Sequence, residues 1–201
     1  MVKRTHGLLW AAAWLAVLLA SGSAARATTL VAGGNYAGQN LANEVHKNED
    51  LHDIILTGAN LTGIDLRGSN LTDALLGGAL LVGADLRGAD FTGASAPGAN
   101  WTNADLRNGV FTGVDFSGGN LSNTDLRNAN LNGASFLGAN LTGARTSGAG
   151  FNGAFYNAFT VLPAGFNTTG MVFVPEGATA QLVLAGLGVL AALPRRARSI
   201  R

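Results

Sequence analysis

A five-residue period runs through the middle of this chain and constrains its fold more than any other feature. Steps of five from Leu56 to Leu141 meet a large apolar residue at every position except Ala96. The residue two places earlier is usually small, and Gly or Asn stands at most positions two places later. An α-helix repeats every 3.6 residues and a strand every two, so neither keeps such a period on one face.

The period instead predicts a chain that turns a corner every five residues. The large and the small residue of each repeat then both point inward, and the other three point outward or form the corner. Gly and Asn suit the corner because unusual backbone angles cost them little.

A second, longer period indicates how the corners are grouped. The triplet Asp-Leu-Arg occurs at residues 65–67, 85–87, 105–107 and 125–127, which is once in every four repeats. Four repeats therefore make one coil, and coils stacked at strand spacing lie about 4.8 Å apart. Roughly six coils give a rod about 27 Å long. We expect Phe91 over Phe111 and Phe116 over Phe136 inside it, with Trp101 also in the core.

The repeats resemble those of the pentapeptide-repeat family, whose consensus is A-[D/N]-L-x-x. Clear copies begin at Ala59, Ala84, Ala104 and Ala139. The resemblance covers over half of the chain. It implies an all-β fold, a right-handed quadrilateral β-helix with four repeats per coil.

The N-terminus has the order of a secretory signal peptide. Lys3 and Arg4 precede an apolar run from Leu8 to Ala20, and a small-residue segment ends in Ala25-Arg26-Ala27. We expect signal peptidase to cleave after Ala27. The alternative is an uncleaved anchor, but the apolar run is shorter than the roughly 20 residues that span a bilayer.

The C-terminus has a second tripartite order. Val174-Pro175-Glu176 precedes an apolar stretch from Ala180 to Leu193, and the basic residues Arg195, Arg196 and Arg198 follow. This arrangement resembles the PEP-CTERM sorting signal of Gram-negative bacteria, which implies recognition by an exosortase. Gly177 stands where that family has its second Pro. The alternative is a plain tail anchor, with the basic cluster cytoplasmic in both cases.

These features predict five segments. Residues 1–27 are a signal peptide, 28–50 an N-terminal cap, 51–163 the β-helix, 164–173 a connector and 174–201 the sorting segment with its transmembrane helix. Hydrophobic helices thus flank the β-helix on both sides. Phe159 replaces a small inward residue, so we expect the coil to distort there, and Pro163 to end the regular path.

Composition excludes several function classes. The net charge of +1 is misleading, because residues 28–173 hold 6 basic and 11 acidic residues. A basic face for nucleic acid is not supported. With no Cys there are no disulfides or thiolate metal sites. We expect no cofactor and no enzymatic activity, because no nucleophile–base pair, phosphate loop or paired acids appear. His46, His52, Glu49 and Asp53 are a weak metal candidate, since charged residues in a cap are usually solvated.

The surface register predicts one face with a charged ladder. Asp65, Asp85, Asp105 and Asp125 form one row, and Arg67, Arg87, Arg107 and Arg127 form the other. The ladder is either a solvated ion-pair network or a site for anionic polysaccharide. Neighbouring rows of Asn and Thr are expected to be ordinary outward residues of such repeats. The alternative is that stacked Asn side chains form hydrogen bonds along the stack.

The leading functional hypothesis is a non-enzymatic, exported scaffold of the cell envelope or extracellular matrix. Its expected partners are signal peptidase, an exosortase-like enzyme, and exopolysaccharide or another envelope protein, with membrane contact through the C-terminal helix before processing. An extracellular polysaccharide-binding module is one alternative. Another is a DNA mimic that protects a topoisomerase, as the resemblance allows; that function needs a strongly acidic cytoplasmic rod.

Overall fold

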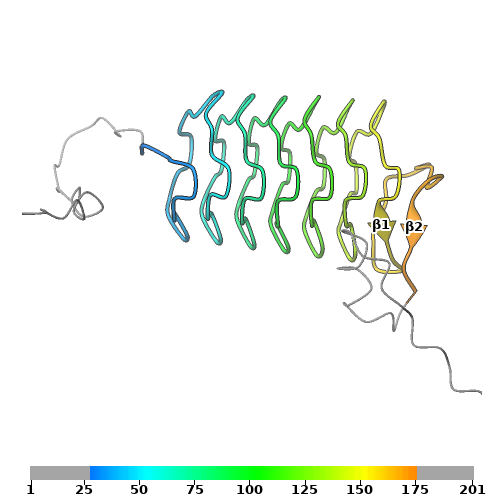
Figure 1. Ribbon diagram of the computed structural model, residues 1–201. Helices are drawn as coiled ribbons and strands as arrows, with labels where there is room; N and C mark the ends of the chain where they lie inside the picture. The colour runs from blue at the N-terminus through cyan, green and yellow to red at the C-terminus, as the bar shows by residue number, and fades with distance from the viewer. Residues whose placement is uncertain (1–27, 176–201) are drawn as a thin grey trace, which may run out of the picture.

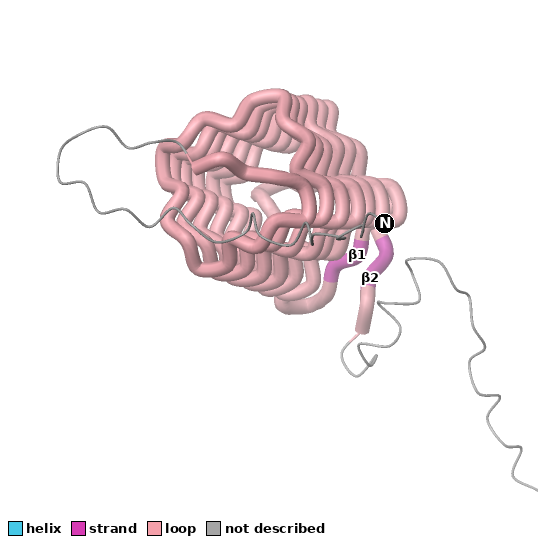
Figure 2. The backbone as a smooth tube through the Cα atoms, turned by 60° about the vertical axis from the view of Figure 1, so that its left-hand side comes forward, coloured by secondary structure: helices cyan, strands magenta, loops and turns pink. Residues whose placement is uncertain are grey.

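The chain forms a straight stack of four-sided coils (Figure 1) in the computed structural model, which describes residues 28–175. The described chain enters at one end of the stack and leaves at the other. Figure 2 shows the coils in register, each behind the next. No helix occurs between residues 28 and 175, and hence none that could cross a membrane. The two flanking hydrophobic helices predicted from the sequence lie outside the described residues.

Each repeat makes one corner of a coil. At Leu56 the corner closes when the Ala59 N–H donates to the Leu56 carbonyl over 2.9 Å. Gly58, the third residue of that turn, has a φ of 64°. A positive φ at the third turn residue is tolerated by Gly, Asn and Asp. The residues other than Gly that adopt it are all of this kind: Asn43, Asn48, Asp53, Asp73, Asn103, Asn108, Asn123 and Asn128.

Backbone hydrogen bonds join each coil to the next. The Leu56 N–H donates to Leu75 O over 2.7 Å, and the Gly58 N–H donates to Gly77 O over 2.9 Å. Parallel bridges link the same position of successive coils, for example Asp65 with Asp85. Because these partners are four repeats apart, the predicted β-helix with four repeats per coil is confirmed.

The core holds the large and small inward residues predicted from the period. Phe91 stacks on Phe111 with 5.3 Å between ring centroids, and Phe116 stacks on Phe136 at 5.4 Å. Trp101 is fully buried and lies edge-on to Phe91 and to Phe116. Both predicted stacks are confirmed, and the aromatic rings form a continuous column in the middle coils.

The coil geometry begins earlier than the sequence suggested. The repeating turn and bridge pattern starts at residue 31, not at 51. Residues 31–50 form a complete first coil, whose inward positions include Tyr36, Leu41 and His46. The segment predicted as a cap is thus built like the rest of the stack and forms its N-terminal end.

The last coil is irregular, as predicted at Phe159. Asn140 bridges to Val161, one position later than the regular register would place its partner. Phe159 is 66% exposed, and Thr160 turns inward to donate to Phe136 O over 2.7 Å. The described chain ends with a parallel pair of short strands, β1 (Phe155–Tyr156) and β2 (Val172–Phe173). The predicted distortion is therefore confirmed as a one-residue insertion.

Candidate functional site

The Asp and Arg residues that recur once per coil form one ladder along the rod. The Asp residues occupy the bridge position of successive coils, and bridges join Asp65, Asp85, Asp105 and Asp125 in order. Each Arg follows two residues later, across the inward Leu. The four predicted pairs are therefore brought together on one face.

Within a coil, each Arg binds both oxygens of its own Asp. Arg67 Nε donates to Asp65 Oδ1 over 2.8 Å, and Arg67 Nη2 donates to Asp65 Oδ2 over 2.7 Å. The other three pairs repeat this geometry. The backbone N–H of Arg67 also donates to Asp65 Oδ1 over 3.3 Å. Two parallel bonds make this the strongest arrangement of guanidinium and carboxylate.

Between coils, Arg67, Arg87 and Arg107 also contact the Asp of the next coil. Arg67 Nε lies 3.4 Å from Asp85 Oδ2, and Arg87 Nε lies 3.7 Å from Asp105 Oδ2. At the N-terminal end Lys47 pairs with Asp65 at 3.1 Å. At the other end Arg145 lies 3.9 Å from Asp125. Opposite charges thus alternate along the whole ladder, which offsets the repulsion within each row.

The two cations at the ends of the ladder, Lys47 and Arg145, were not predicted from the sequence. Lys47 stands in the Arg row, one coil before Arg67, and Arg145 stands in the Asp row, one coil after Asp125. The spacing of four repeats that defines the ladder also identifies these two residues. The ladder therefore ends in a cation on both sides.

Ion pairing shifts the pKa values of the charged side chains in the ladder. Hydrogen bonds from the Arg67 side chain hold the pKa of Asp65 well below its ordinary value of 3.8. The Arg87 and Arg127 side chains likewise lower the pKa values of Asp85 and Asp125. The same kind of bond raises the pKa values of Arg67, Arg87, Arg107 and Arg127. All of these shifted groups are ionised at neutral pH.

The Asn and Thr rows are used inside their own corners. Asn60 Oδ1 accepts the backbone N–H of Thr62 over 3.2 Å and its hydroxyl over 2.7 Å. Within residues 28–175, side-chain amides donate hydrogen bonds to the preceding coil from Asn60 to Asn40 and from Asn70 to Asp50. The rows are thus mostly outward residues whose amide oxygens serve their own turns, and the alternative of Asn hydrogen bonds along the stack is realised at few positions of the described rod.

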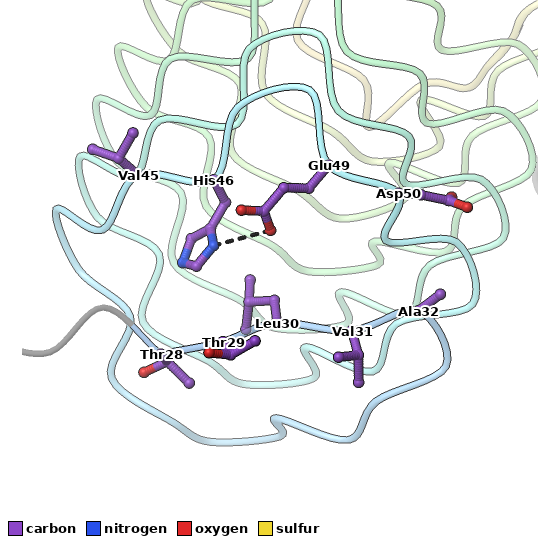
Figure 3. Close-up of a pocket in the computed structure, with 9 residues that line it drawn as sticks. All are labelled: Thr28, Thr29, Leu30, Val31, Ala32, Val45, His46, Glu49 and Asp50. Carbon is purple, nitrogen blue, oxygen red and sulfur yellow. Dashed lines mark hydrogen bonds and ion pairs between the residues drawn. The ribbon is translucent and has the colours of Figure 1, made fainter.

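Charged residues gather at the N-terminal end around a hollow of about 520 Å³, drawn in Figure 3. His46 occupies an inward position and is 3% exposed. Its Nε2 lies 3.0 Å from Glu44 Oε2, and its Nδ1 lies 3.2 Å from Glu49 Oε2. Burial raises the pKa of Glu44, but bonds from His46 and Thr28 outweigh it and the net shift is downward. Thr28 ties the entering chain to Glu44.

The weak metal candidate is not assembled. His46 turns inward, whereas His52 is exposed and binds Asp50 at 2.9 Å. The carboxylates around His46 contact opposite nitrogens of the ring, so they cannot share one ion with it. Residues 28–175 hold no group of three or more His, Asp or Glu suited to a metal.

Most residues of the predicted sorting sites lie outside the described part of the chain. These are Ala25, Ala27, Glu176, Arg195, Arg196 and Arg198. Of the C-terminal motif, Val174 donates its N–H to Tyr156 O over 2.8 Å, and Pro175 follows as the last described residue. The motif thus begins where the stack ends.

The stacked five-residue coils define a repeat β-helix, and comparison with known proteins identifies its family. The profile of pentapeptide repeats matches in 8 copies, at residues 47–73, 69–108, 84–123, 110–145 and 120–154. The chain belongs to the pentapeptide-repeat family. The curated proteins give no match.

Solved structures similar to this chain include two pentapeptide-repeat proteins and a resistance protein. One from the Arabidopsis thaliana thylakoid lumen is 36% identical, with a TM-score of 0.47, over 48% of this chain and 68% of that one. One from Nostoc PCC 7120 is 32% identical, with a TM-score of 0.39, over 52% of this chain and 84% of that one. QnrB1, a plasmid-mediated fluoroquinolone resistance protein, is 19% identical, with a TM-score of 0.33, over 79% of this chain and 99% of that one.

Proposed function

We propose that this protein is a non-enzymatic, exported scaffold of the cell envelope or extracellular matrix. The observation that carries the proposal is the pairing of each ladder Arg with both oxygens of its own Asp. The side chains that look most like a ligand row bind one another instead. The longer contacts of Arg67, Arg87 and Arg107 with the Asp of the next coil then help the backbone bonds to hold the coils in register.

The remaining polar cluster of the described residues supports the same view. His46, Glu44 and Glu49 are engaged with each other at the end of the stack. They give this end of the stack a polar surface, as the terminal repeat of a solenoid requires. Neither this cluster nor the ladder supplies a nucleophile with a base beside it.

The order of residues at the two termini supports the proposed location. The segment before Thr28 has the order of a cleaved signal, and the segment from Val174 onward has the order of a sorting signal. We infer that signal peptidase and an exosortase-like enzyme process the chain, with the C-terminal segment in the membrane before processing.

Mass spectrometry of the protein from separated cell fractions tests this proposal. The expected mature protein begins at Thr28 and is found in the envelope or outside the cell. Loss of mass beyond Pro175 would show that the sorting segment is cleaved although Gly177 replaces Pro. Full-length protein in the soluble cytoplasm would overturn the proposal.

One observation favours polysaccharide binding as a second candidate function. The ladder face carries six cations, Lys47, Arg67, Arg87, Arg107, Arg127 and Arg145, against the four Asp residues. Two positive charges therefore remain. Glycan-array binding that disappears when Arg87 and Arg107 are changed to Ala would assign this function; binding that survives in the variant would exclude the ladder as its site.

The electrostatics disfavour a DNA mimic. A mimic needs rows of uncompensated acids, whereas Asp65, Asp85, Asp105 and Asp125 are each paired with Arg. A gyrase supercoiling assay with the protein checks this. We expect no protection of gyrase from a fluoroquinolone.

A further inference from the structure

The two ends of the rod differ in their charge. The N-terminal coil contains Glu44, His46, Lys47, Glu49 and Asp50. No Asp, Glu, Lys, Arg or His occurs from residue 146 to residue 175, and the first charged residue after Arg145 is Glu176. A rod surrounded by water on all sides does not need such an asymmetry.

The uncharged end also exposes large apolar side chains. The exposed fractions are 66% for Phe159, 49% for Val161, 45% for Val172 and 50% for Phe173. The Phe173 ring packs edge-on against Tyr156, with 5.3 Å between centroids. A group of exposed apolar residues marks a surface that contacts a partner or a membrane.

The backbone at this end of the rod limits how deeply the end can enter a membrane. Within residues 28–175, β2 (Val172–Phe173) pairs on one side only, with β1 (Phe155–Tyr156). An edge strand presents backbone N–H and C=O groups that need water or another partner. Such groups are not tolerated in hydrocarbon, but the headgroup region hydrates them. At that depth, Phe and Tyr side chains can remove their apolar surface from water.

The length of chain beyond the rod brings this end close to the membrane. The described chain ends at Pro175, directly after β2. The apolar stretch of the sequence begins at Ala180, so at most about 18 Å of extended chain separates the two. This step rests on the proposed function, in which that stretch enters the membrane.

We propose that the C-terminal end of the rod lies on a lipid surface, with Phe159, Val161, Val172 and Phe173 in the headgroup region. The membrane is the one that holds the chain's own C-terminal segment. The rod then projects from the bilayer. Its charged N-terminal coil, which lies at the opposite end of the stack (Figure 1), faces away from the membrane. The occupant of the apolar end is lipid, not a second copy of the chain.

Spin labels test this placement directly, because the chain has no Cys and a single introduced Cys is labelled uniquely. The full chain is reconstituted at a low protein-to-lipid ratio in phosphatidylcholine and phosphatidylglycerol vesicles. Variants Phe173→Cys and Phe159→Cys report the apolar end. Val45→Cys, whose parent side chain is 56% exposed at the opposite end, is the matched control. Two reporter positions keep the test valid if one variant misfolds.

Power saturation then compares collisions with oxygen, which concentrates in lipid, and with a water-soluble nickel chelate. We expect oxygen to dominate at residues 173 and 159 and the chelate to dominate at residue 45. Chelate dominance at all three positions, on vesicles that retain the protein after carbonate washing, overturns the inference and leaves membrane anchoring intact. Protein that washes off the vesicles overturns the proposed anchoring itself. Shielding of the labels from both reagents, together with dipolar coupling between labels on two chains, would show that a second copy covers this end instead of lipid. That result would also overturn the inference.

Discussion

The rings of Phe91 and Phe111, which occupy the same position in successive coils, stack with 5.3 Å between centroids and 16° between planes. Both rings are fully buried. Phe111 also contacts Phe116, with 6.0 Å between centroids, and Phe116 continues the column to Phe136. The middle of the rod therefore depends on rings that are held in place by the coils above and below them.

Replacing Phe111 by Ala is expected to lower the free energy of unfolding by about 3–5 kcal/mol. The change removes a fully buried ring and leaves a cavity that a rigid backbone ladder cannot close. Denaturant unfolding followed by circular dichroism measures it. Phe111→Leu restores the residue most common at this position in other coils and should cost under about 1.5 kcal/mol. Equal losses in both variants would contradict this account.

Two turn glycines with the same backbone angles should respond differently to Ala. Gly58 and Gly63 have φ values of 64° and 65°. A Cβ at Gly58 meets no atom within 4 Å, whereas a Cβ at Gly63 falls 2.5 Å from Asn43 Oδ1. We expect Gly58→Ala to cost about 1–2 kcal/mol from the left-handed conformation alone. Gly63→Ala should cost slightly more, because the Asn43 side chain must turn away from the new methyl group. Thermal and denaturant unfolding measure both.

A second change isolates the clash at Gly63. Asn43 itself has a φ of 61°, so Asn43→Gly is compatible with its turn. In the Asn43→Gly background, Gly63→Ala should cost about as much as Gly58→Ala. A Gly63→Ala cost that is unchanged by the loss of Asn43 would show that the side chain is not the cause.

The coils could be predicted from the sequence because their geometry depends on the number of residues in each repeat and in each coil. Four repeats of five place Asp65 under Asp85 whatever the surrounding side chains are. The distortion at Phe159 was predictable from side-chain size, since a large residue does not fit the small inward position; that it takes the form of one extra residue was not predicted. The first coil was missed because Tyr36 and His46 replace the expected aliphatic residues.

The role of His46 could not be predicted from hydrophobicity. A polar residue at an inward position is tolerated only if partners satisfy it, and those partners, Glu44 and Glu49, come from neighbouring corners. Side-chain hydrogen bonds between Asn residues of successive coils are few in residues 28–175 for a related reason. An Asn side chain can form hydrogen bonds along the stack or within its own turn. It bonds to the partner that the local backbone places nearest.

Acid should destabilise the rod through the ladder. Pairing with Arg lowers the folded-state pKa values of Asp65, Asp85 and Asp125 below the ordinary value of 3.8. Their contribution to stability is therefore complete above that value and is lost as pH falls through the lower folded-state values. We expect the melting temperature to fall steeply below about pH 4. The double variant Asp85→Asn with Arg87→Gln should show a shallower acid slope; an unchanged slope would remove this pair from the explanation.

The final prediction concerns the charged end of the rod. His46→Leu restores the usual inward residue but leaves Glu44 and Glu49 without the ring that each contacts, at 3.0 and 3.2 Å. Loss of partners for polar groups near the core costs about 1–3 kcal/mol. Because a solenoid unfolds from its ends, the cost should appear in the first coil. We expect faster hydrogen exchange at the Leu41 amide, which bonds to Asn60 O, with no change at the Leu86 amide in the middle of the stack.

A triple variant separates the loss of the contacts of His46 with Glu44 and Glu49 from the change in side-chain shape. Adding Glu44→Ala and Glu49→Ala to His46→Leu converts the first coil to ordinary repeats, and slow exchange at Leu41 should return. The same variant exposes an apolar coil end next to Val45 and Val31, so it should associate with increasing concentration, as measured by sedimentation velocity. Slow exchange without association would show that His46, Glu44 and Glu49 are needed neither to hold the first coil nor to keep the end of the rod from pairing.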